Sequence, residues 1–161
     1  MNHLPKSKKT TSRYEKLLVG LVTDKIDFAV VGGLAVIFNG YPRLPLEAAI
    51  IISNSPENLN KLIKSLKCLG EGWARELKLE DFSGEPGAVR LIEDFGLDMF
   101  VIMREKTLDD FRPRLRYLKT SGVRIPYLAP EDLIFLKDGS WRDKDRLDVA
   151  AMREIIAREG R

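Results

Sequence analysis

The paired glycines Gly32 and Gly33 stand where a sequence could bind phosphate. They follow the apolar run 28–31, which predicts a buried strand, and precede 34–39, which predicts a short helix. A strand that turns into a helix at glycines exposes backbone N–H groups at the helix N-terminus and lets an anion approach them. The turn is therefore a candidate phosphate site, although tight strand-to-helix packing uses glycine in the same way.

Two acidic residues could hold metal ions beside that turn. Glu47 precedes the apolar run predicted as a strand at 48–53, and Asp98 lies near the start of the strand predicted at 97–103. Residues two apart on a strand share a face, so positions 47 and 49 would project together. Carboxylates that converge at a sheet edge, facing a glycine turn, suit Mg²⁺ and a nucleoside triphosphate. Position 49, however, is alanine, which offers no ligand atom.

The elements that must position these residues predict an α/β (α+β) domain, with a small mixed sheet flanked by helices. Ser55 suits a helix N-cap and Pro56 the first helical position, and Pro126 predicts an edge strand. The charged segment 108–118 is predicted to be irregular because Pro113 limits any helix. Helices are expected at 12–22, 34–39, 55–70, 130–138 and 143–159. Strands are expected at 28–31, 48–53, 88–93, 97–103 and 123–128, with 88–93 and 97–103 forming a hairpin.

The length of 161 residues fits one domain, assigned to 13–161, after a flexible basic arm at 1–12. The net charge of +3 and pI of about 9.0 are compatible with an anionic partner but do not require one. One cysteine excludes an intrachain disulfide, and no apolar run approaches the roughly 20 residues of a membrane span. We therefore expect a cytoplasmic protein with no membrane contact. The only histidine, His3, lies in the arm, which argues against histidine-based catalysis.

The stretch VVGGLAVIFNGYPR, followed by a strand, resembles the opening of the minimal nucleotidyltransferases of the DNA polymerase β superfamily. The resemblance is closest to the group that includes AbiEii-like toxins and the MNT antitoxins of HEPN–MNT pairs. Gly32, Gly33 and Arg43 match the family pattern, and Asp98 matches its third acid. The similarity continues through the helix at 55–70 and the C-terminal helical pair, so it spans 28–152.

The resemblance implies a role for each matching residue. Glu47 and Asp98 would be the catalytic and metal-binding residues, with Mg²⁺ as cofactor and ATP or another nucleoside triphosphate as substrate. The nucleotide-binding residues would be Gly32, Gly33, Arg43, Lys137, Arg142 and Lys144, and the charged positions of the C-terminal pair also include Asp145 and Asp148.

Three departures from the family pattern fall within five positions. Pro45 replaces the usual threonine, Glu47 the first aspartate of the Asp-x-Asp motif and Ala49 the second. Alanine removes a ligand that should bridge two ions, and the extra methylene of glutamate displaces the other ion by about 1 Å, which can itself cost 10²-fold in rate. The sequence therefore predicts a nucleotidyltransferase-family protein whose transfer is weak or lost, with residual nucleotide and metal binding.

Other functions remain compatible with the sequence. One is a non-catalytic interaction protein, an antitoxin-like partner in a toxin–antitoxin pair; another is an active transferase that uses Glu47 and Asp98 with one metal to modify a protein, an RNA or a small molecule. A dinucleotide-binding domain is disfavoured because the glycines do not fit G-x-G-x-x-G.

Several single residues have plainer roles open to them. Arg43 could pair with a neighbouring acid, and Asp98, set in an apolar strand, needs a partner of some kind. Trp141 is read as a hydrophobic anchor. The positive residues Arg112, Arg114, Arg116, Lys119 and Arg124 could attract RNA, but they lack the interleaved aromatic residues of a stacking surface.

Overall fold

The computed structural model describes residues 5–43, 47–68, 77–82, 89–92 and 96–160. Its helices are α1 (Pro5–Thr23), α2 (Gly32–Phe38), α3 (Pro56–Lys67), α4 (Leu108–Phe111), α5 (Pro130–Lys137) and α6 (Asp143–Arg158). Its strands are β1 (Phe28–Val31), β2 (Glu47–Ile52), β3 (Val89–Ile92), β4 (Gly96–Phe100), β5 (Arg116–Thr120) and β6 (Val123–Tyr127). Single 3₁₀ turns lie at Leu79–Asp81 and Arg112–Arg114.

The strands form one mixed sheet in the order β3-β4-β2-β1-β6-β5. The central strand β1 is antiparallel to β2 and parallel to β6, while β2 is parallel to β4. The outer pairs β3–β4 and β5–β6 are antiparallel. The predicted fold class, a small mixed sheet with flanking helices, is confirmed.

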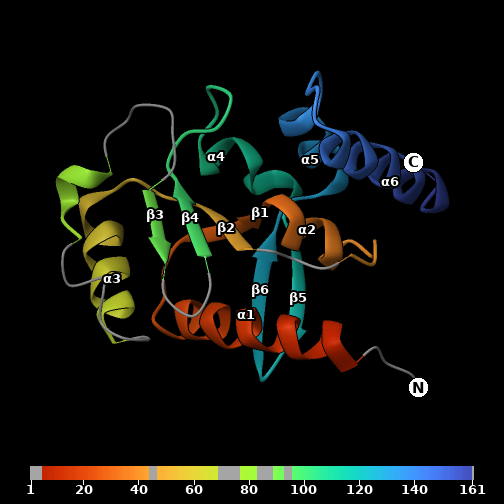
Figure 1. The fold of residues 1–161 in the computed structure, drawn as a ribbon. Coiled ribbons are helices and arrows are strands. Elements are labelled where there is room, and N and C mark those ends of the chain that lie inside the picture. Colours follow the sequence, from red (N-terminus) through yellow and green to blue (C-terminus); the bar gives the residue numbers. More distant parts are fainter. Residues whose placement is uncertain (1–4, 44–46, 69–76, 83–88, 93–95, 161) are drawn as a thin grey trace.

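The longer helices lie in two groups around this sheet (Figure 1). Helix α1 packs against β6 and α3, whereas α5 and α6 pack on each other and both contact α2. All four residues of β1 are buried, as its apolar sequence requires. The fully buried side chains that surround it include Leu18, Leu21, Leu34, Ile50, Ile51, Leu62, Leu66 and Leu97. No helix in the described ranges is long and apolar enough to cross a membrane.

Several local predictions are confirmed. Ser55 caps α3 by accepting a hydrogen bond from the Asn58 N–H, and Pro56 occupies the first helical turn. Strands β3 and β4 form the expected hairpin.

Helix α1 begins earlier than expected. Its first residue is Pro5, inside the segment 1–12 that the sequence assigns to a flexible arm.

Two predictions about the outer strands are wrong. The segment 108–118, predicted to be irregular, contains α4 and the first part of β5. The strand carrying Pro126 is not at an edge, since β6 lies between β1 and β5. Its pairing with β1 is confined to Val30 and Tyr127, beside the hydrogen bond from the Leu128 N–H to the Val30 carbonyl. Backbone donors alternate sides along a strand, so the nitrogen of Pro126 faces β1 as that of Leu128 does. Because proline has no N–H to donate, the ladder does not continue toward Phe28, and Pro126 is tolerated in an interior strand whose pairing is this short.

The turn between β1 and α2 requires glycine at its first position. Gly32 has a φ of +67°, a region that side chains strongly disfavour, and a Cβ placed on it would lie 3.4 Å from the Cβ of Ala49. At the other end of α2, Asn39 donates from Nδ2 to the carbonyls of Ala35 and Leu128. Helix α2 is thus fixed at one end by backbone conformation and at the other by a buried amide.

We expect Gly32→Ala to lower the free energy of unfolding by about 1–2 kcal/mol, because alanine is strained at positive φ. Gly20→Ala is the matched control: Gly20 lies inside α1 with open space around it, so the substitution should stabilise by up to about 1 kcal/mol. Urea denaturation of both variants measures the difference. A Gly32→Ala protein as stable as the wild type would contradict the strained turn.

Candidate functional site

The strand register brings the candidate residues to one end of the sheet. Because β1 is antiparallel to β2, the glycine turn after β1 lies beside the start of β2, and Ala49 pairs with Val31. Because β2 is parallel to β4, Ala49 also pairs with Asp98 and Glu47 with Gly96. The strand carrying Asp98 therefore lies beside the strand that follows the glycine turn, as expected. The side chain of Glu47 and the whole of Pro45 lie outside the described part of the structure.

Asp98 is held by an arginine on the neighbouring strand. Arg90 of β3 stands directly opposite Asp98 in the hairpin register. Its Nε lies 2.8 Å from one carboxylate oxygen, and its Nη2 donates to the other at 3.0 Å. The Asp98 side chain is 11% exposed and that of Arg90 51%, so the buried acid is neutralised by a cation that solvent reaches. Asp98 does have the partner that a buried acid needs, but that partner is a protein cation.

Sequence reasoning missed Arg90 because of the hairpin bounds. With strands at 88–93 and 97–103, residue 93 would face 97 and residue 92 would face Asp98. The observed strands pair Ile92 with Gly96, which shifts the register by two residues and places Arg90 opposite Asp98. The sequence did contain a signal for this ion pair, because Arg90 is a basic residue close to Asp98 across the predicted hairpin.

Arg43 lies on the glycine turn but bonds to α6. A Cβ placed on Gly33 would meet the Arg43 guanidinium carbon at 3.3 Å, so the guanidinium rests against the backbone there. Its Nη1 donates to both carboxylate oxygens of Asp148, at 2.7 and 2.6 Å, and the Asp148 side chain is 2% exposed. Arg43 thus pairs with an acid that follows it by 105 residues, the plainer of the roles open to it.

Lys137 extends this pair into a charge cluster, defined here as Arg43, Lys137, Arg142, Asp145 and Asp148. The Lys137 ammonium lies 3.0 Å from Asp145 and 3.1 Å from Asp148. Asp145 also accepts hydrogen bonds from Ser140 and Arg142. Three cationic and two anionic side chains give the cluster a net charge of +1. Lys144 is exposed and forms no hydrogen bond or ion pair with the described residues.

Asp145 is strongly acidic in this environment. Burial by itself opposes its charged form, but the hydrogen bonds from Ser140, Lys137 and Arg142 outweigh burial and lower its pKa to about 2. A pKa below the unfolded value of 3.8 stabilises the fold at pH values above 3.8, and this contribution is lost as the pH falls toward 2.

We therefore expect Asp145→Asn to destabilise the protein in a pH-dependent way. Compared with the wild type, the ionic part of the loss should be about 2 kcal/mol above pH ~5 and should fade between pH ~4 and ~2. Denaturant unfolding across that range measures it. Asp143→Asn, which removes the same charge from an exposed acid two residues earlier, is the control. A constant difference between Asp145→Asn and the wild type at all pH values would contradict the assignment.

The described residues do not fit a two-metal site. Ala49 lacks a ligand atom, and Asp98 is already ion-paired with Arg90, although its buried Oδ1 accepts no hydrogen bond from the described residues. Within the ranges that the structure describes, no group of three or more His, Cys, Asp or Glu side chains could hold a metal ion. The two buried acids on α6, Asp145 and Asp148, are bonded to cations instead.

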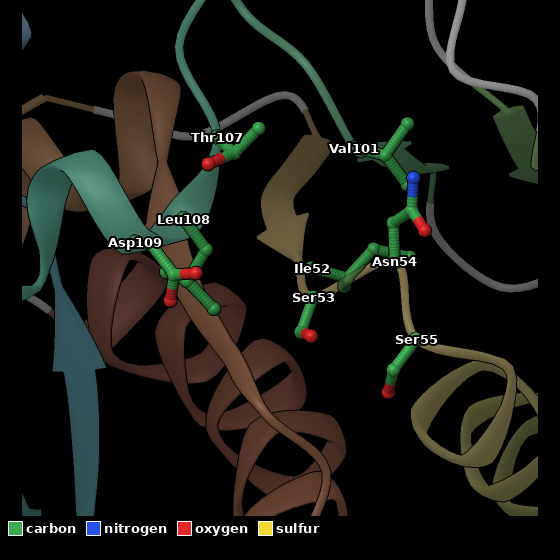
Figure 2. A pocket seen from close by; sticks show the side chains of 8 residues that line it. All are labelled: Ile52, Ser53, Asn54, Ser55, Val101, Thr107, Leu108 and Asp109. Carbon is green, nitrogen blue, oxygen red and sulfur yellow. The ribbon is translucent and has the colours of Figure 1, made fainter.

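A separate cavity lies at the other end of the same strands. Its volume is about 250 Å³, and Figure 2 shows its walls coming from the end of β2, the start of α3 and the start of α4. The lining residues are Ile52, Ser53, Asn54, Ser55, Val101, Thr107, Leu108 and Asp109. Its only charged lining group is a carboxylate, and β2 and β4 both run away from the glycine turn toward it. This cavity is therefore not the predicted phosphate site.

The positive region of the sequence is largely paired with acids. Hydrogen bonds donated to carboxylates raise the pKa of three arginines: Arg112 donates to Asp27 and Asp109, Arg114 to Asp132 and Arg116 to Glu159. Arg124 stacks over the ring of Tyr117. This pairing reduces the charge available to attract RNA.

The strand order and the glycine turn after β1 define the nucleotidyltransferase fold. Among solved structures the chain is similar to the lincosamide antibiotic adenylyltransferase LnuA in its lincomycin-bound form, with a TM-score of 0.65 and 15% identity over 89% of this chain and 96% of that one. A protein from Thermotoga maritima described as a nucleotidyltransferase gives a TM-score of 0.59 and 17% identity, covering 94% of each chain. An antigenic nucleotidyltransferase-like protein from Paracoccidioides brasiliensis gives 0.58 and 18%, covering 92% of this chain and 77% of that one. No family model and no curated protein matches the sequence.

Proposed function

We propose that this protein binds a nucleoside triphosphate at the glycine turn and has weak or lost nucleotidyl transfer. The observation that carries the proposal is the placement of Arg43, which lies on Gly33 and joins the turn to the charge cluster of α5 and α6. Gly32, Gly33, Arg43, Lys137 and Arg142 form the nucleotide site in this proposal, with Lys144 reaching in from the start of α6. The similarity to three proteins described as nucleotidyltransferases or nucleotidyltransferase-like supports it.

The same geometry supports the loss of efficient transfer. Two-metal catalysis needs carboxylates that are available to bridge both ions. Here position 49 has no carboxylate, and Asp98 is engaged by Arg90. Weak Mg²⁺ binding through Glu47 and Asp98, and transfer with a single ion, would require Arg90 to leave its partner.

Calorimetric titration with ATP tests the binding site. We expect saturable binding, with Arg142→Gln weakening it about 3- to 10-fold because a charge-assisted contact to phosphate is lost. Arg142 is suited to this test because its side chain is 56% exposed and its partner Asp145 keeps Lys137 and Ser140. Arg124→Gln, which removes the same charge from β6, is the matched control and should bind like the wild type.

No saturable heat with ATP, GTP, CTP or UTP would contradict the nucleotide proposal. Equal weakening by Arg142→Gln and Arg124→Gln would reduce it to nonspecific attraction by net charge.

Incubation with labelled triphosphates and Mg²⁺ tests the second half of the proposal. We expect no transfer above background to added protein, RNA or small-molecule acceptors, since a bridging ligand is missing. Transfer that Asp98→Ala abolishes would contradict the loss of activity and establish the one-metal transferase instead.

A non-catalytic interaction protein is the second candidate, and the exposed apolar residues of the C-terminal pair favour it. Trp141 is 82% exposed and Leu147 60% exposed, so Trp141 is not the internal anchor expected from the sequence. Exposed aromatic side chains are common centres of protein interfaces. Co-purification with the product of an adjacent gene would support this role if Trp141→Ser abolished it and Tyr117→Ser did not. ATP titrations that show no saturable heat would also favour the interaction protein over the nucleotide-binding protein.

A further inference from the structure

The Arg90–Asp98 pair stands at the position where the fold would place a metal-binding acid. Asp98 is next to Ala49 across β2 and β4 and next to Arg90 across β3 and β4. It is the only acid in these three strands whose side chain the structure describes. Its Oδ2 accepts a hydrogen bond from Arg90 Nη2 at 3.0 Å, and its Oδ1 lies 2.8 Å from Arg90 Nε in the same ion pair without forming a hydrogen bond.

We propose that Arg90 is a built-in counter-ion that takes the place of the divalent cation at Asp98, so that the site binds a nucleoside triphosphate without metal. This inference rests on the proposed nucleotide site and specifies its ligand as the metal-free triphosphate.

Electrostatics explains why such a counter-ion is needed. A triphosphate carries several negative charges, and an unscreened carboxylate beside it would repel it strongly where water is partly excluded. In a metal-dependent site the divalent ion offsets that repulsion and also needs several oxygen ligands. Ala49 has removed one such ligand, whereas a guanidinium needs only the carboxylate of Asp98. One arginine therefore offsets the repulsion without the ligand that the site has lost.

The charges around the glycine turn are consistent with an anion arriving alone. Arg43 and Lys137 neutralise Asp148, Arg142 and Lys137 neutralise Asp145, and the cluster keeps a net charge of +1. The pair at Asp98 adds no net charge. A metal–nucleotide complex would have to displace Arg90 to reach Asp98, and leaving a buried charge pair broken is costly.

The experiment is a calorimetric titration of the full-length protein with ATP, once in EDTA and once in excess Mg²⁺. For the wild type we expect the two dissociation constants to agree within about threefold. Arg90→Gln exposes the Asp98 charge to the triphosphate, so binding in EDTA should weaken by about tenfold or more, and Mg²⁺ should recover part of it.

A charge-neutral double variant separates this role from a structural one. Arg90→Gln combined with Asp98→Asn keeps similar shapes, leaves no unpaired charge and should restore metal-free binding to within about threefold of the wild type. Arg124→Gln controls for net charge. Thermal denaturation shows which variants are folded. If Arg90→Gln is unfolded, the comparison of metal-free binding between the double variant and the wild type decides the role of Arg90.

The outcomes separate the two proposals. Binding of the wild type only with Mg²⁺ would overturn the counter-ion and leave the nucleotide site standing. Binding in neither buffer would overturn the nucleotide site itself. The counter-ion proposal would also be overturned if Arg90→Gln left metal-free binding unchanged. It would be overturned as well if the folded double variant no longer bound ATP without metal.

Discussion

The register between β1, β2 and β4 is the constraint on which the candidate site depends. Because β2 is antiparallel to β1 and parallel to β4, the glycine turn, Ala49 and Asp98 must meet at one end of the sheet. A slip of one residue in β2 would exchange side chains between its two faces, and both faces are already packed, since Ile50 and Ile51 are fully buried on opposite sides. Positive φ at Gly32 then fixes where α2 begins and how closely Ala49 approaches.

The acids that are buried near the site form ion pairs with arginine and lysine side chains. The strand register and the packing of the helices place these acids there. Asp98 has Arg90, Asp148 has Arg43 and Lys137, and Asp145 has Lys137 and Arg142. Buried carboxylates without partners would be costly, so these pairs hold α6 and β3 against the rest of the domain. In the nucleotidyltransferase pattern that the sequence resembles, acids near the turn hold metal ions. In the function proposed for this chain, arginine and lysine side chains take the place of those ions.

Local signals made much of the fold predictable from sequence. The apolar runs gave β1 and β2, the glycines gave the turn, and Ser55 with Pro56 gave the start of α3. The two misses have different causes. Strand β5 pairs with β6 across the two-residue turn Ser121–Gly122, a local hairpin signal that was overridden by the charges and Pro113 of the preceding segment. The interior position of β6, by contrast, depends on pairing with the distant strand β1 through a single residue.

The sequence named the segments of the candidate site but not the charge partners of their residues. Gly32, Gly33, Arg43 and Asp98 could be named from the family pattern, and the strand order brings their segments together. The partner of Arg43 lies 105 residues further along the chain, and that of Asp98 was hidden by a two-residue shift in the hairpin register. Partners of this kind follow from tertiary packing and from register, both of which are finer than periodicity resolves.

The central claim is that protein cations, not metal ions, balance the acids beside the glycine turn. A crystal structure with a non-hydrolysable ATP analogue and Mn²⁺, measured at a wavelength where manganese scatters anomalously, tests it most directly. The account predicts triphosphate density against Gly33 and Arg43, an intact Arg90–Asp98 pair and no anomalous peak at Asp98. An anomalous peak between the phosphates and Asp98, with Arg90 turned away, would contradict it.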